Sequence, residues 1–249
     1  MAGRVEGRNV ILTGAAGGIG RAVGHALCSE GARVLLVDRD EAGAVAAADA
    51  LRARAARCEP MGVDVTQEAA WPQIVRACSQ AFGPPDALIN NAAINRFPAL
   101  ADESLDGWSD VLAVNLTAAF LGMREVIPGM IERGHGAIVN VSSTWGLVGA
   151  AMAAAYQASK GGITMLTKHA AVAYGKHGLR VNSIHPGLID TPMNDGMSPA
   201  QRDAEIAKHP LGRAGVPSEV ATAVTYLISD EAAFVTGAAL PIDGGYTAA

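Results

Sequence analysis

Short apolar runs rich in β-branched residues alternate along the chain with longer Ala- and Leu-rich segments of helical period. The short runs are typical of buried strands, whereas apolar residues spaced three and four apart favour helices. The short runs predict strands at residues 9–12, 33–37, 61–63, 87–90, 137–141, 180–184 and 239–242. The longer segments predict helices at residues 21–30, 41–56, 68–82, 105–133, 155–174 and 217–228.

Strands that are apolar throughout and alternate with helices are typical of βαβ units, which build a parallel sheet covered on both faces. Right-handed crossovers then give a doubly wound arrangement. No repeat, linker or block of charge marks a domain boundary. The sequence therefore predicts one α/β domain over residues 1–249. We expect a Rossmann-type, doubly wound parallel sheet of about seven strands with helices on both faces.

Residues 185–216 interrupt this alternation, because they are rich in Pro, Gly and Met and follow the sixth predicted strand. Connections of this length in a compact domain are usually functional. Ligands of doubly wound sheets bind beyond the carboxyl ends of the strands. We therefore predict that residues 185–216 form a substrate loop or lid within the domain.

Composition and charge exclude several classes of partner. Of the 249 residues 50% are hydrophobic, which is enough for one large core. The net charge is −5 and the Lys and Arg residues are scattered, so no basic patch for nucleic acid is visible. No uncharged apolar stretch reaches about 18 residues, and the N-terminal residues do not resemble a signal peptide. We expect a cytoplasmic protein that binds neither nucleic acid nor a membrane.

Cysteines and histidines offer no pattern of metal ligands. Cys28, Cys58 and Cys78 are far apart and form no C-x-x-C pair, and the six His residues lack metal-ligand spacing. Isolated cysteines of this kind are usually small buried residues in a reducing compartment. We therefore expect neither a disulfide framework nor a metal site, and we expect each His on the surface or in the core.

The first predicted strand leads into a glycine-rich turn, Thr13–Gly20, and then into a helix. Glycines let the backbone turn tightly and approach a ligand, and a helix N-terminus offers free N–H groups to a pyrophosphate. The turn is therefore predicted to bind a dinucleotide through Gly14, Gly17, Gly18 and Ile19. Its G-x-x-x-G-x-G spacing is a weak signal alone, which leaves a purely structural turn open.

Asp38 ends the second predicted strand, eighteen residues after Gly20. A carboxylate at this place can accept hydrogen bonds from an adenosine ribose and repels a 2′-phosphate. Arg39 could in principle bind such a phosphate, but the glycine turn holds no Lys or Arg before Gly20. The balance favours NAD as cofactor and makes NADP less suitable. A helix N-cap preceding Glu41 is the alternative role for Asp38.

Tyr156 and Lys160 lie four residues apart on a predicted helix and therefore share one face. A free tyrosine, with a pKa of about 10, is a poor base, but a nearby ammonium group favours the phenolate. Ser143 ends a predicted strand and could hold a substrate oxygen while Tyr156 handles the proton. Carbonyl–alcohol interconversion by hydride transfer needs these two functions. Pairs four residues apart are common on helices, so the pair alone also fits a surface role.

The ordered set of motifs resembles the short-chain dehydrogenase/reductase family over the whole chain. Each element is common by chance, but the set in this order is specific. Ala93 departs from the glycine that is usual in the family, which should only tighten the backbone there. The elements are Thr13-Gly14-x-x-x-Gly18-Ile19-Gly20, Asp38, Asp64-Val65, Asn90-Asn91-Ala92-Ala93, Asn115, Ser143, Tyr156-x-x-x-Lys160, Pro186-Gly187 and Thr191.

The resemblance implies a catalytic group of Asn115, Ser143, Tyr156 and Lys160. Lys160 would also bind the nicotinamide ribose, and Asn115 would hold a water that relays protons from Lys160 to solvent. Local helix packing is the alternative for Asn115, which is a poor helix former. Further cofactor contacts implied by the resemblance are Asp64 and Val65 near the adenine, Asn91, and Ile189 and Thr191 at the nicotinamide carboxamide.

Family members of this size are usually homotetramers, and the resemblance implies the same assembly here. The helices around Asn115 and Tyr156 are the expected contacts between subunits. Small residues on their outer faces would permit close approach. These residues are Ala118, Ala119, Gly122, Ala170, Ala171 and Ala173.

The predicted function is NAD-dependent interconversion of a secondary alcohol and a ketone, with Tyr156 as the acid–base group. Trp145 and Met193 are expected to contact the substrate together with Ser143 and Tyr156. The remaining candidates for the pocket wall are apolar, which favours an alicyclic, aromatic or steroid-like small-molecule alcohol. A 3-oxoacyl thioester reductase and a non-catalytic dinucleotide-sensing protein are the alternatives. The apolar candidates are Leu147, Val148, Met152, Leu188 and Met197.

Overall fold

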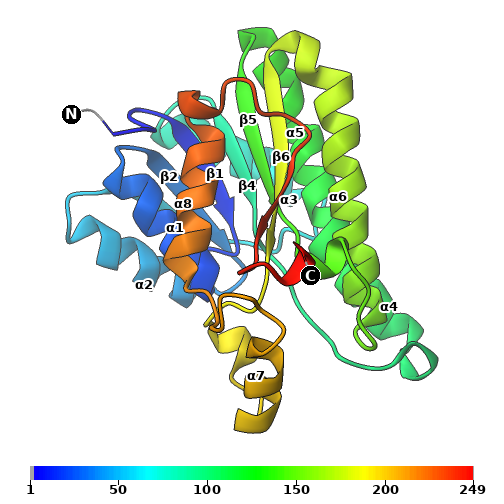
Figure 1. Ribbon diagram of the computed structural model, residues 1–249. Helices are drawn as coiled ribbons and strands as arrows, with labels where there is room; N and C mark the ends of the chain where they lie inside the picture. The colour runs from blue at the N-terminus through cyan, green and yellow to red at the C-terminus, as the bar shows by residue number, and fades with distance from the viewer. Residues whose placement is uncertain (1–2, 249) are drawn as a thin grey trace.

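A computed structural model describes residues 3–248, which build a parallel sheet with helices packed on it (Figure 1). The strands are β1 (Asn9–Thr13), β2 (Arg33–Asp38), β3 (Arg57–Gly62), β4 (Ala87–Asn90), β5 (Gly136–Val141), β6 (Leu179–Pro186) and β7 (Ala239–Ile242). They pair in the order β3-β2-β1-β4-β5-β6-β7, and every neighbouring pair is parallel. The strand order reverses between β1 and β4, which is where doubly wound sheets bind ligands. The predicted Rossmann-type sheet is confirmed.

Helices cover both faces of this sheet. They are α1 (Gly18–Ser29), α2 (Glu41–Arg52), α3 (Ala70–Ala81), α4 (Leu105–Leu112), α5 (Ala118–Arg133), α6 (Ala154–Tyr174), α7 (Pro199–Ile206) and α8 (Pro217–Ile228). One face is covered by α1, α2 and α8, and the other by α3, α5 and α6 (Figure 1). A separate hydrophobic cluster fills the space under each layer.

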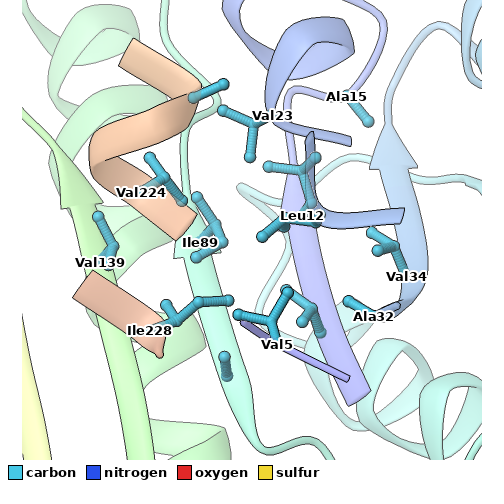
Figure 2. Packing of buried hydrophobic residues seen from close by; sticks show 14 of the residues in the cluster. Val5, Leu12, Ala15, Val23, Ala32, Val34, Ile89, Val139, Val224 and Ile228 are labelled. Atoms are coloured by element: carbon cyan, nitrogen blue, oxygen red, sulfur yellow. The ribbon is translucent and has the colours of Figure 1, made fainter. Parts of the chain in front are cut away.

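The central strands contribute side chains to both clusters, because successive residues of a strand point to opposite faces. In β1, Val10 and Leu12 lie in the cluster under α1 and α8, whereas Ile11 lies in the cluster under α3 and α5. Figure 2 shows Leu12 and Ile89 in the first cluster together with Val224 of α8. Burial on both faces is the reason why these strands are unbroken apolar runs in the sequence.

Two predicted boundaries are wrong near the edge of the sheet. The strand predicted at residues 61–63 is β3, which begins four residues earlier and ends at Gly62. It pairs with β2 alone, and its side chains are partly exposed, so its sequence lacks an apolar run. The helix predicted over residues 41–56 ends at Arg52, and Ala55 beyond it has a φ of 63°, which a helix does not contain.

The helix predicted at residues 105–133 is continuous, but the turn Ala113–Thr117 between α4 and α5 is π-helical. Such turns are rare and frequent at functional sites, and Asn115 lies in this one. By length and composition alone, Leu105–Arg133 could cross a membrane. Half of its most apolar window is buried inside the protein, so packing on the sheet accounts for its composition.

The small residues expected on the outer faces of α5 and α6 lie mostly against the core instead. They are small because these helices pack closely on the sheet. The residues that this corrects are Ala118, Ala119, Gly122, Ala170 and Ala171. The solvent-facing sides carry large apolar residues instead: Phe120 is 43%, Met165 63% and Val172 86% exposed.

Residues 185–216 contain more regular structure than the predicted loop. The strand β6 continues to Pro186, and α7 forms at Pro199–Ile206. A capping box begins α7: Gln201 N donates to Ser198 Oγ (3.3 Å), and Ser198 N donates to Gln201 Oε1 (2.9 Å). The Ser-Pro-x-Gln pattern is the sequence signal for this start. The helix lies beyond the carboxyl ends of the strands (Figure 1).

Candidate active site

The glycine turn after β1 is held in place by the segment that follows β4. Asn91 Nδ2 donates to the carbonyl oxygens of Thr13 and Gly14, at 3.0 Å each. Thr13 Oγ1 accepts from the backbone N–H groups of Asn91 (3.0 Å) and Ala92 (3.1 Å). Asn91, which the family resemblance connects with the cofactor, therefore braces the turn that is expected to bind the pyrophosphate.

The turn leaves little room for side chains. Gly14 has a φ of 66°, and a Cβ there would lie 2.8 Å from Ala92 Cα. A Cβ on Gly18, the first residue of α1, would lie 2.8 Å from Thr191 Cγ2. Gly17, the N-cap of α1, is exposed, and Ile19 is half-buried. Bare backbone at a helix N-terminus fits a pyrophosphate group.

Asp38 lies directly beside this turn at the end of β2. Its carboxylate accepts from Ala16 N (2.9 Å) and from Asp40 N (3.0 Å). The N-cap of α2 is Asp40, which accepts from Gly43 N (3.0 Å). The alternative role of Asp38 as an N-cap is therefore wrong. A carboxylate fixed beside a phosphate-binding turn is well placed to accept from ribose hydroxyls.

Asp64 and Val65 follow β3 next along this edge. Asp64 Oδ1 accepts from Thr66 N (2.9 Å) and Thr66 Oγ1 (2.8 Å), and its side chain is exposed. Val65 is 7% exposed, and its carbonyl accepts from Trp71 Nε1 (3.0 Å). Val65 thus packs in the core, while Asp64 has a carboxylate at the surface that can contact a ligand.

The segment after β6 returns to the glycine turn. Thr191 contacts the region of Gly18, as the close approach of its methyl group shows. Ile189 forms an isolated β-bridge with Gly215, and its carbonyl accepts from Asn194 Nδ2 (2.7 Å). Residues far apart in the sequence, Gly18 and Thr191, therefore lie together where the two halves of the sheet meet.

Ser143, two residues after the end of β5, lies near Tyr156 of α6. Ser143 is 8% exposed, and its Oγ accepts from Trp145 N (3.2 Å). The rings of Trp145 and Tyr156 meet edge to face, with centroids 6.2 Å apart. Burial raises the pKa of Tyr156, and the neighbouring Ser143 side chain opposes this shift.

Lys160 lies behind the Tyr156 ring and is 2% exposed. Its Nζ donates to the Val141 carbonyl (2.8 Å) and is 5.4 Å from the centroid of the Tyr156 ring. Burial lowers the pKa of Lys160 to about 8. The pKa of Tyr156 is raised and not lowered as expected, because burial is the largest cause and the opposing group is Ser143 rather than Lys160.

Asn115 links three parts of the site through its amide. Its Oδ1 accepts from Ile94 N (2.8 Å), and its Nδ2 donates to Ile94 O (2.9 Å) and Ser159 Oγ (3.2 Å). The π-turn therefore fixes the segment after β4 to α6, next to Lys160. This amide is a bridge between elements, which is more than local helix packing.

A buried histidine beneath Ser143 was not among the predicted site residues. His185 is fully buried, with Nδ1 2.8 Å from the Ser143 carbonyl and Nε2 2.9 Å from Ser183 Oγ. Because a carbonyl only accepts, Nδ1 carries the proton and Nε2 accepts from Ser183. Burial lowers the pKa of His185, which favours this neutral form. The sequence offered one signal for this role: His185 directly follows a predicted buried strand, and a buried imidazole must find hydrogen-bond partners.

Comparisons with known proteins find relatives that match the whole length of the chain. A family model described as enoyl-(acyl carrier protein) reductase matches residues 14–247. The chain is 39% identical, over all of both chains, to 2-(S)-hydroxypropyl-CoM dehydrogenase 3 of Xanthobacter autotrophicus. It is 42% identical, over 99% of both, to cyclopentanol dehydrogenase of a Comamonas species. The crystal structure of gox2181 superposes with a TM-score of 0.96 at 35% identity, covering 99% of this chain and 98% of that one.

The fold and the matched relatives define an oxidoreductase that uses a nicotinamide dinucleotide. The chain belongs to the short-chain dehydrogenase/reductase family. The resemblance drawn from the ordered motifs of the sequence is therefore confirmed over the full length of the chain.

Proposed function

We propose that the protein is an NAD-dependent dehydrogenase that interconverts a secondary alcohol and a ketone. The observation that carries this proposal is the grouping of Ser143, Tyr156 and Lys160, with Ser143 bound to His185 near the end of β6. The Ser143 side chain lies near enough to Tyr156 to lower the pKa of the phenol, and Lys160 Nζ lies 5.4 Å from the centroid of the Tyr156 ring. A hydroxyl donor and an acid–base group at one point suit an oxygen that changes between alcohol and carbonyl.

In the proposed mechanism Ser143 orients the substrate oxygen. The N–H of Trp145 occupies one lone pair of Ser143 Oγ, which leaves the hydroxyl proton free to be donated. Tyr156 Oη takes the alcohol proton during oxidation and returns it during reduction. NAD, when bound, supplies the hydride acceptor. His185 holds the Ser143 carbonyl, which keeps the Ser143 hydroxyl directed at the substrate oxygen.

Lys160 and Asn115 act behind Tyr156 in this proposal. Lys160 would stabilise the phenolate when its ammonium turns from the Val141 carbonyl, and it would bind the nicotinamide ribose. Asn115 holds the backbone at Ile94 and the Ser159 hydroxyl, which keeps α6 in place. A proton relay through a water at Asn115 is part of the proposal.

The cofactor would lie across the switch point of the sheet. Its pyrophosphate would meet the glycine turn, and Asp38 would accept from the adenosine ribose hydroxyls. The repulsion between this carboxylate and a 2′-phosphate supports NAD rather than NADP. The residues proposed to hold the cofactor are Gly14, Gly17, Gly18, Ile19, Asp38, Asp64, Val65, Asn91, Tyr156, Lys160, Ile189 and Thr191.

The substrate proposed is an uncharged alcohol with an apolar body. Two loops, one after Trp145 and one after Thr191, expose apolar side chains: Leu147 is 40%, Val148 38%, Met152 46% and Met193 51% exposed. Trp145 is proposed as the floor of the pocket, since its ring contacts Tyr156. The cyclopentanol dehydrogenase among the relatives supports a cyclic apolar alcohol.

A thioester reductase is the second candidate, because the matching family model is described as an enoyl-(acyl carrier protein) reductase. The Ser143–Tyr156 arrangement also suits reduction of a 3-oxoacyl thioester. No observation favours the non-catalytic alternative, since all four catalytic candidates lie at one site.

The experiment that tests the proposal is a panel of secondary alcohols with NAD and NADP, run beside 3-oxoacyl thioesters with NADH and NADPH. We expect oxidation of cyclic secondary alcohols with NAD. Turnover of thioesters alone would favour the reductase. Binding of NADH without turnover of any substrate would contradict both.

A further inference from the structure

The loop of residues 147–153 connects the two sides of the candidate active site. It begins two residues after Trp145 and ends three residues before Tyr156. Leu147, Val148 and Met152 expose apolar side chains on it. The loop therefore forms an apolar wall, and each end of it is joined to a residue that is proposed to contact the substrate, Trp145 at one end and Tyr156 at the other.

The backbone of the loop makes few hydrogen bonds of its own. Leu147 N and Val148 N donate to Thr144 O, at 2.8 and 3.0 Å, which closes the turn at its start. Ala153 N donates to Pro98 O (2.9 Å) at its end. Between these points, the hydrogen bonds that the structure describes for residues 149–152 all go to one side chain.

That side chain is Gln157. Its Oε1 accepts from Ala150 N (2.8 Å), while its Nε2 donates to Ala150 O (2.9 Å) and to Met152 O (2.5 Å). The amide thus uses both of its donors and an acceptor on the loop. Because it holds the N–H and the C=O of the same residue, it fixes the direction of the chain at Ala150 as well as its position.

Gln157 also places the loop relative to the acid–base group, since it follows Tyr156 directly in α6. Between the loop and the helix, Ala153 is fully buried in the left-handed region, with φ 61° and ψ 48°. A non-glycine residue keeps this conformation only where its surroundings impose it. The bond from Gln157 N to Ala153 O (3.0 Å) is one of those restraints.

We propose that Gln157 is a positioning residue that fixes the apolar wall of residues 147–152 at a set distance from Tyr156, and thereby sets the selectivity for bulky over small secondary alcohols. The inference rests on the proposed function. A ring that fills the pocket contacts this wall, whereas a small alcohol reaches Tyr156 without it. Loss of the amide therefore weakens binding of the ring and leaves the reacting atoms untouched.

The test compares Gln157→Met with a matched control, Gln73→Met. Methionine has a similar length and shape but cannot form the three bonds. Gln73 lies on α3, outside the site, and donates only to Ala69 O (3.1 Å). With NAD saturating, we expect Gln157→Met to lower kcat/KM for cyclopentanol at least about tenfold, mainly through KM. The value for 2-propanol should change less than about twofold, and Gln73→Met should leave both values at wild-type level.

Gln157→Glu provides a second variant. Its carboxylate can still accept from Ala150 N but opposes the carbonyls of Ala150 and Met152, so we expect the same loss of selectivity at neutral pH. Partial recovery is expected towards acidic pH, where a protonated carboxyl group regains one donor. An equal loss for both alcohols in both variants, or no loss in either, would overturn the proposed role.

Hydrogen exchange provides a readout that does not depend on turnover. The amide of Ala150 should exchange at least about tenfold faster in Gln157→Met, with the amides in the middle of α6 unchanged. If the wild type oxidises no secondary alcohol, the proposed function fails. The exchange measurement still tests whether the Gln157 side chain holds the loop at Ala150. Unchanged exchange at Ala150 would show that Gln157 does not hold the loop.

Discussion

The acid–base role of Tyr156 depends on the groups that surround its phenol. Burial raises its pKa, and burial lowers the pKa of Lys160 to about 8. Alcohol oxidation needs the deprotonated base. In the proposed mechanism the Lys160 ammonium turns from the Val141 carbonyl towards the phenolate and lowers the pKa of Tyr156. We therefore expect the rate to rise with pH through an ionisation below that of free tyrosine.

Tyr156→Phe tests this role at the level of one atom. The ring and its contact with Trp145 stay, but the proton acceptor is lost, so we expect kcat to fall about 10²–10⁴-fold. The rising limb of the pH profile should disappear, and NAD affinity in a fluorescence titration should be kept. Lys160→Ala should weaken both turnover and NAD binding. If the Tyr156→Phe variant keeps most of its activity and its pH profile still has the rising limb, another residue is the base.

The proposed preference for NAD rests on the charge of Asp38. Asp38→Ala removes the ribose acceptor and the repulsion of a 2′-phosphate, so the ratio of NAD to NADP efficiency should fall at least about tenfold, or about 1.4 kcal/mol. Steady-state kinetics with both cofactors measure this ratio. Asp38→Asn separates the effect of the charge from that of the local structure, since it removes the charge but keeps an acceptor for Ala16 N. A ratio that stays constant in both variants would refute the assignment of NAD.

At the scale of secondary structure, α7 is the element that the loop prediction missed. Helices of eight residues are marginal alone, so this one depends on its cap and its contacts. Its place beyond the strand ends suits the lid predicted for residues 185–216. Met193, a proposed substrate contact, lies just before it in the turn Pro192–Asn194.

Ser198→Ala should loosen this proposed lid. Loss of an N-cap costs about 1 kcal/mol of local stability, so amides of α7 should exchange faster and the substrate KM should rise about twofold or more. The melting temperature of the whole protein should change little. Thr222→Ala is a suitable control, because its hydroxyl bonds within α8 to Ser218 O (2.9 Å). Faster exchange in α7 with an unchanged KM would mean that the helix is not a lid.

The long helices and the central strands could be predicted because each carries a clear period of apolar residues. The full length of the edge strand β3 could not be predicted, since this strand pairs with one neighbour and exposes Arg57 and Glu59. The π-turn at Asn115 was also hidden, because one additional residue in a helical turn leaves no mark on a period of three to four.

At the scale of the whole molecule, we expect a homotetramer in which α5 and α6 contact partner subunits. The exposed apolar residues on these helices, and not the small residues first considered, are the expected contacts. Met165→Glu together with Val172→Glu should therefore lower the mass measured by light scattering at micromolar concentration. A wild type that is monomeric under these conditions would contradict the assembly.

The sequence by itself determined the order of strands and helices, the glycine turn and the ordered motif set that identifies the family. These features are local, since a period, a turn or a spacing involves neighbouring residues. It also named Ser143, Tyr156 and Lys160 as one group, because their spacing matches the family.

The tertiary structure decided what each of these residues touches. Asp40 rather than Asp38 caps α2, Asn91 braces the glycine turn, and His185 lies under Ser143. It also brought Thr191 against Gly18, across more than half of the chain. Contacts of this kind depend on how strands and loops distant in the sequence meet at one edge of the sheet. These contacts are set by tertiary packing, and they cannot be predicted from a local pattern of residues.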